Sequence, residues 1–108
     1  MKESFGQYIR RKRTEQGLTL TQFGAKIDLD SANLSKIENG KREFDEKRLP
    51  LLSKTLNIDI ESLRIEYYSD FIAKKIYKSE NSKGILEVAE EKVQYLQAKN
   101  VKQAKLKL

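Results

Sequence analysis

The chain has 108 residues, of which 38% are hydrophobic and 35% charged, and its formal net charge is +6. It contains no cysteine and no histidine, which excludes disulfides, thiolate or imidazole metal ligands and a Ser-His-Asp triad. The positive charge favours a polyanionic partner.

The positive charge is concentrated in the C-terminal part of the chain. Residues 1–66 hold 13 Lys/Arg and 11 Asp/Glu, whereas residues 67–108 hold 9 and 5. Affinity of the N-terminal part for an anion must therefore come from the placement of individual side chains. No apolar run is long enough to span a bilayer, and the first residues lack the apolar region of a signal peptide. We therefore expect a cytoplasmic protein without a membrane partner.

Three short helices are predicted in the first 40 residues. Apolar residues recur at helical spacing over residues 4–16, and Gly17 is expected to end that helix. Thr19 and Gln22 form a capping box that begins a second helix, which is expected to end at Asp28. A third helix, capped by the aspartate before it, is expected over residues 31–39.

Two further helices complete the N-terminal part. Asp45 is expected to cap a fourth helix, which has Pro50 near its start and Asn57 at its end. Asp59 is expected to cap a fifth helix, whose apolar stripe continues to about Lys78. No segment alternates apolar and polar residues as a strand does, so the sequence predicts an all-α fold.

The C-terminal part is predicted to form a helical hairpin. Residues 79–84 are expected to be a turn, and a second apolar stripe from Ile85 predicts a helix to about residue 98. We therefore expect residues 67–98 to be a hairpin with a dimerisation role, and residues 99–108 to be a Lys-rich tail that frays. The residues expected to mediate dimerisation are Tyr68, Phe71, Ile72, Ile76, Val93 and Leu96.

Residues 9–42 show a family resemblance. The segment IRRKRTEQGLTLTQFGAKIDLDSANLSKIENGKR resembles the helix-turn-helix of phage-repressor and Cro-like (Xre-type) transcription regulators, most specifically in LSKIENGKR. The resemblance extends over residues 5–63. It implies a five-helix repressor-like helix-turn-helix domain at residues 1–66, followed by the hairpin, and double-stranded DNA as the partner.

The resemblance also implies which side chains contact DNA. Leu34 and Ile37 are expected to anchor the third helix on the core, with its opposite face in the major groove. Of the base-facing residues, Lys36 can donate to guanine, the serines can bond to any base edge, and Ala32 can contact a thymine methyl. The base-facing set is Ser31, Ala32, Ser35 and Lys36, and the phosphate-contacting set is Thr19, Thr21, Asn33, Asn39, Lys41 and Arg42.

The family pattern predicts one contact within the chain, and the chain differs from the pattern at three positions. Arg13 and Glu38 occupy positions that pair in family members, and we expect a structural salt bridge between them. Leu20 stands where the family has a phosphate-binding Gln, Asp28 stands at the turn glycine, and Phe44 replaces a frequent proline. Asp tolerates the left-handed backbone conformation at some cost, so the turn is still expected to form.

The hairpin leaves two functions open. Packing of its two helices explains part of the apolar pattern, and self-association explains more of it. The hairpin also resembles the tail of a subgroup of these regulators that often lies beside methyltransferase or restriction genes. We expect a homodimeric, sequence-specific repressor or autoregulator. The resemblance of its tail suggests that it controls a restriction-modification or methyltransferase operon. The alternative is an antitoxin or other protein-interaction module that binds its partner through the hairpin.

An enzyme is disfavoured by the sequence. Its carboxylates are scattered over caps and solvent faces, and it has no glycine-rich phosphate loop. The sequence indicates no cofactor, no metal and no particular small-molecule effector.

Overall fold

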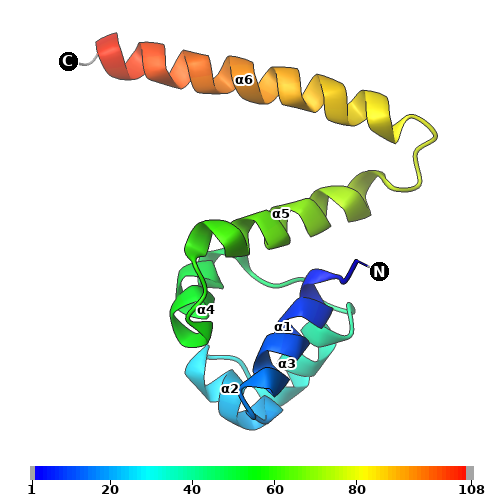
Figure 1. Cartoon of the computed structure of the whole chain (residues 1–108), viewed down its shortest axis with the longest axis vertical. Helices are drawn as coiled ribbons and strands as arrows, with labels where there is room; N and C mark the ends of the chain where they lie inside the picture. Colours follow the sequence, from blue (N-terminus) through cyan, green and yellow to red (C-terminus); the bar gives the residue numbers. More distant parts are fainter. Residues whose placement is uncertain (1, 107–108) are drawn as a thin grey trace. The chain divides into compact units, whose positions relative to one another are not determined.

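The computed structural model describes the backbone of residues 2–106, in which it shows α-helices, one short 3-10 helix and no strand (Figure 1). The all-α prediction is confirmed. The chain divides after Ile72 into two units. The elements in chain order are α1 Phe5–Glu15, α2 Leu20–Lys26, α3 Ser31–Glu38, η1 Glu46–Arg48, α4 Leu49–Leu56, α5 Ile60–Ile76 and α6 Ser82–Leu106.

Side-chain caps define the starts of the first three helices. The Thr19 hydroxyl accepts from the Gln22 amide, and the Gln22 side chain accepts from the Thr19 amide, which is the predicted capping box. Ser4 and Gln7 make a second capping box at α1, and Asp30 accepts from the Asn33 amide at α3. These caps fix where α2 and α3 begin, and so they fix the turn between them.

The predicted fourth helix is two elements. Asp45 caps the 3-10 helix η1 by accepting from the amide of Lys47, only two residues away. The α-helix α4 begins at Leu49 without a side-chain cap, and Pro50 lies in its first turn, where an amide donor is not needed. Asn57 ends α4 in the left-handed conformation with φ 54°. The predicted end is therefore confirmed, whereas the predicted start was wrong.

The N-terminal unit is built around a hydrophobic core to which α1 to α5 all contribute. Two close backbone approaches tighten it. A Cβ atom at Gly6 would lie 2.3 Å from the carbonyl oxygen of Ile37, and one at Gly24 would lie 2.3 Å from that of Leu29. The buried hydrophobic residues are Phe5, Tyr8, Ile9, Phe23, Ile27, Leu34, Ile37, Phe44, Leu49, Leu52, Leu56 and Leu63.

The two last helices differ from the prediction at their ends. α5 stops at Ile76, and α6 starts at Ser82 and continues to Leu106. The predicted Lys-rich tail is therefore helical through Leu106, because Lys, Gln, Ala and Leu are good helix formers and no proline or glycine interrupts them. The predicted domain boundary at residue 66 lies inside α5. Within the described range, no helix combines the length and the apolar character needed to cross a membrane.

Candidate DNA-binding site

The helix α3 is anchored to the core by one face. Leu34 is fully buried and Ile37 is 4% exposed, as the sequence predicted. The carbonyl of Ile37 lies against Gly6 of α1, so the two helices are in backbone contact. Because α3 is held on this side, its opposite side is presented to solvent in a fixed orientation.

A salt bridge holds the C-terminal end of α3 to α1. Arg13 Nε lies 2.8 Å from Glu38 Oε2, and Nη2 lies 3.0 Å from Oε1, a bidentate arrangement. The Arg13 guanidinium also donates to the carbonyl of Leu18 at 2.8 Å. The hydrogen bonds to Glu38 raise the pKa of Arg13. The structure thus contains the predicted pair, and the Glu38 side chain points inward, with the residue 6% exposed.

The turn between α2 and α3 is fixed by a residue that the sequence analysis missed. Asp28 has φ 58°, the left-handed conformation expected at this position. Arg48 Nη1 donates to the carbonyls of Ile27 at 2.8 Å and Asp28 at 2.9 Å. No local sequence signal predicts this contact, because Arg48 lies 20 residues farther along the chain than the turn.

The outer face of α3 carries the predicted base-facing residues. Ser31, Ala32 and Lys36 are exposed, and Ser35 is half-buried. The set offers one ammonium, two hydroxyls and one methyl group, which are all short-reaching apart from the lysine. The structure therefore brings these four side chains to one solvent-facing side of the anchored helix.

The predicted phosphate-contacting residues are partly held by one another. Arg42 Nη1 donates to Asn33 Oδ1 at 2.5 Å, and Asn33 Nδ2 donates to the Asp30 carboxylate at 2.9 Å. Asn39 Nδ2 donates to the Ser35 carbonyl at 2.9 Å. The remaining members, Thr19, Thr21 and Lys41, are exposed. The loop after α3 is therefore tied to the start of α3, and its cations reach solvent.

Two departures from the family pattern have structural roles. Leu20 packs against the hydrophobic core, so it offers an apolar side chain in place of a polar contact. Phe44 is 3% exposed, and its ring meets that of Phe5 edge-on with centroids 5.8 Å apart. Phe44 thus anchors the loop after α3 to α1, a role that the sequence analysis did not assign.

The predicted dimerisation residues carry exposed apolar surface. On α5, Tyr68, Phe71 and Ile72 are 42%, 43% and 46% exposed, and Ile76 is half-buried. On α6, Val93 and Leu96 are 50% and 56% exposed. Such apolar side chains cost free energy when left in water, and they are the kind of surface that association covers.

The family follows from comparison with known proteins. The model of the helix-turn-helix family matches residues 9–63, which covers α2 to α4 together with most of α1 and the start of α5. The chain belongs to the helix-turn-helix family. The helix-turn-helix module of this chain is accordingly that of a DNA-binding transcriptional regulator.

Two curated relatives agree with this assignment. The HTH-type transcriptional repressor RghR of Bacillus subtilis (strain 168) is 37% identical over 62 residues, 56% of this chain. The control protein C.MunI of Mycoplasma sp is 38% identical over 64 residues, 58% of this chain. The chain spans 46% of the length of RghR and 86% of the length of C.MunI.

Solved structures show the same fold for this helix-turn-helix protein. The clp gene regulator ClgR from C. glutamicum matches 60% of this chain and 84% of its own, with a TM-score of 0.51 and 23% identity. A second crystal structure of ClgR matches 85% of this chain and 84% of its own, with a TM-score of 0.52 and 20% identity.

Proposed function

We propose that the chain is a homodimeric, sequence-specific transcriptional repressor or autoregulator whose α3 lies in the major groove of DNA. The observation that carries the proposal is the anchoring of α3. One side is held by Leu34, Ile37 and the Arg13–Glu38 pair, while Ser31, Ala32 and Lys36 stay exposed on the other. A rigid helix with a polar outer face is what base recognition in the major groove requires.

The surrounding side chains supply the sequence-independent part of binding. The exposed Lys41 and Arg42 follow α3 directly, and Thr19 and Thr21 lie at the start of α2. Contacts from such residues to phosphates position a protein on the duplex without selecting a sequence. Ser31, Ala32, Ser35 and Lys36 would then select the bases, with Lys36 giving the strongest discrimination.

A fluorescence anisotropy titration tests this function. The full chain is titrated with its own upstream DNA and with a scrambled duplex at physiological salt. We expect much tighter binding to the upstream DNA, and Lys36→Ala should reduce that preference by roughly 5- to 150-fold. The matched control is Lys54→Ala, an exposed lysine of α4. Equal binding of both duplexes by the unmodified chain would refute sequence specificity.

The dimer is proposed from the exposed apolar side chains of α5 and α6. A two-fold dimer places two copies of α3 about 34 Å apart, one turn of DNA, and so combines two short reading faces. Sedimentation tests it: Ile72→Glu should dissociate the dimer, whereas Ile65→Glu, at an α5 position 68% exposed and outside the proposed surface, should not. A monomeric unmodified chain would instead favour the antitoxin or interaction-module alternative.

The biological setting proposed for the repressor is an operon of restriction-modification or methyltransferase genes. It is supported by the resemblance of residues 71–96 to the tail of regulators found beside such genes. The name of the relative C.MunI, a control protein, agrees with it. The neighbouring genes decide this point directly: a toxin gene next door would support the alternative.

A further inference from the structure

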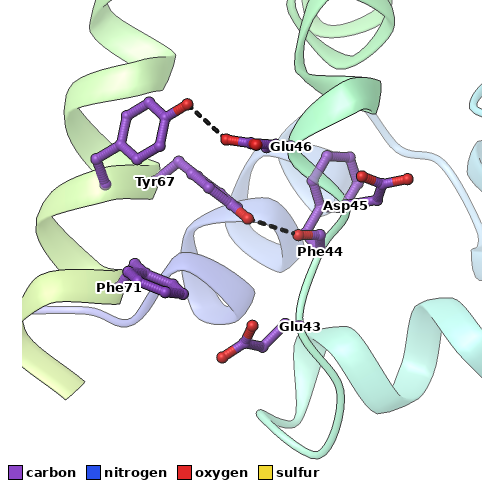
Figure 2. Close-up of a pocket in the computed structure, with 7 residues that line it drawn as sticks. Glu43, Phe44, Asp45, Glu46, Tyr67 and Phe71 are labelled. Carbon is purple, nitrogen blue, oxygen red and sulfur yellow. Dashed lines mark hydrogen bonds between the residues drawn. The ribbon is translucent and has the colours of Figure 1, made fainter. Parts of the chain in front are cut away.

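A hollow lies in the N-terminal unit between the loop after α3 and the helix α5. Its volume is about 420 Å³, within the usual range of small-molecule sites. The hollow combines aromatic walls with an acidic rim (Figure 2). Its lining residues are Glu43, Phe44, Asp45, Glu46, Tyr67, Tyr68 and Phe71.

The two sides of this pocket are joined by tyrosine hydroxyls. Tyr67 donates to the carbonyl oxygen of Phe44 at 2.9 Å, and Tyr68 donates to Glu46 Oε2 at 2.7 Å. The two tyrosine rings meet edge-on with centroids 5.2 Å apart. The loop and α5 are therefore fixed to one another before any ligand arrives, which lowers the entropic cost of binding.

The charge of the pocket is opposite to that of the chain. Figure 2 shows Glu43 and Glu46 extending from the loop toward the side of α5 that carries Tyr67 and Phe71, whereas Asp45 caps η1. Burial raises the pKa of Tyr67, and the negative charges of Glu46 and Glu43 raise it further. The two carboxylates therefore act on the aromatic side of the pocket. In the described part of the chain, neither glutamate has an ion-pair partner.

We propose that this pocket binds an organic cation, an ammonium or guanidinium group that carries an apolar body. Aromatic faces attract a cation through their quadrupole and also accept its apolar part, and two carboxylates add direct charge attraction. The same carboxylates repel phosphates, so the pocket is distinct from the DNA-binding site. All of the lining residues belong to one copy of the chain, and two of them are shared with the proposed dimer surface.

The proposal is tested by calorimetric titration of the full chain with choline as the probe. The comparison ligand is the neutral isostere of choline, in which carbon replaces the quaternary nitrogen, and sodium chloride matches the ionic strength. We expect saturable binding of choline and binding of the isostere weaker by roughly threefold to thirtyfold. Equal affinities would overturn the proposal, because apolar contact alone would then explain them.

Two variants locate the site. The double change Glu43→Gln and Glu46→Gln should weaken choline binding by roughly threefold to thirtyfold, and Phe71→Leu, which keeps apolar volume, should weaken it within the same range. Glu87→Gln, an exposed glutamate of α6, is the matched control and should not change it. Unchanged binding in the double variant would overturn the proposal.

A lysine of a second copy is the competing occupant. Tyr68 and Phe71 also belong to the proposed dimer surface, so sedimentation of the same variants without choline separates the two cases. If the double variant dissociates the dimer and choline does not bind the unmodified chain, the pocket is occupied by a lysine of a second copy and the proposal is wrong. Since DNA binding is measured separately, its failure would leave the choline result intact.

Discussion

Arg13 and Glu38 lie 25 residues apart in the sequence and join α1 to α3 through two parallel hydrogen bonds of 2.8 and 3.0 Å. Their side chains are only 11% and 4% exposed, so water screens the pair weakly. The bidentate geometry fixes direction as well as distance. The orientation of α3 on the core therefore depends on an ion pair in addition to apolar packing.

Arg13→Ala is expected to lower the free energy of unfolding by about 3 kcal/mol, because it leaves a buried carboxylate without its partner. Urea denaturation measures the change. Arg11→Ala is the matched control, since Arg11 pairs with Glu3 and Glu15 at the exposed surface of the same helix; its cost should be clearly smaller, because water screens an exposed ion pair. Similar costs for the two variants would show that the buried pair contributes no more than a surface pair.

Gly24→Ala is expected to destabilise the chain by roughly 1–3 kcal/mol, because the new Cβ would lie 2.3 Å from the carbonyl oxygen of Leu29. The backbone there is held by the Leu29 amide, which donates to the Gly24 carbonyl at 2.8 Å. Thermal and urea unfolding measure the effect.

Gly84→Ala provides the control for that substitution. The nearest atoms that its Cβ would meet belong to the Asn81 side chain, at 2.7 Å, and that side chain can rotate away. Because alanine favours a helix by about 0.5–1 kcal/mol over glycine, α6 should not lose stability. A stable Gly24→Ala variant would mean that the turn after α2 can shift freely.

Asp28→Gly is expected to stabilise the chain by about 1 kcal/mol, since glycine adopts the φ of 58° without a steric cost. The Asp28 carboxylate is exposed and only 4.0 Å from Arg48, so its removal costs little. Asp28→Ala is the control: it removes the carboxylate but keeps the Cβ, and it should not stabilise. A glycine variant no more stable than the alanine variant would contradict this explanation.

Residue patterns predicted the local contacts, whereas the one distant contact that was predicted, the Arg13–Glu38 pair, came only from the family resemblance. Thr19 and Asp30 were recognised as caps because a cap bonds an amide three residues away, within one short motif. The outer face of α3 could be placed because helical periodicity separates it from Leu34 and Ile37. By contrast, Arg48 holds a turn 20 residues earlier, and its role depends on how α4 packs.

Alkaline pH is expected to destabilise the N-terminal unit, in part through Tyr67. Burial and the nearby glutamates raise the pKa of Tyr67, so the folded state keeps its hydroxyl proton longer than the unfolded state does. The contribution of Tyr67 to the free energy of unfolding is therefore fully present below pH of about 10, the ordinary tyrosine pKa. It is lost as the pH rises above that value. Tyr67→Phe should reduce this fall in urea titrations across that range.

The control for the alkaline titration is Tyr95→Phe, a tyrosine 67% exposed on α6. It should reproduce the fall of the unmodified chain. Tyr67→Phe also removes the hydrogen bond to Phe44, which lowers the free energy of unfolding by the same amount at every pH below the transition. This constant difference can be told apart from a change in the slope of the free energy of unfolding against pH. An identical slope in Tyr67→Phe and the unmodified chain would show that Tyr67 does not contribute to the pH dependence.

Arg42→Ala is expected to weaken binding to operator and random duplexes by similar factors, because a phosphate contact carries no base sequence. The Arg42 guanidinium is exposed next to Asn33, at the start of α3. The slope of log affinity against log salt should become less steep by about 0.9, because the variant neutralises one phosphate fewer. Anisotropy titrations at several salt concentrations measure both quantities.

Arg64→Ala is the control for this prediction, because Arg64 is an exposed arginine of α5 that pairs with Glu61, and the variant should keep the slope. A weakening confined to operator DNA would instead place Arg42 on a base edge, and the phosphate assignment would be wrong.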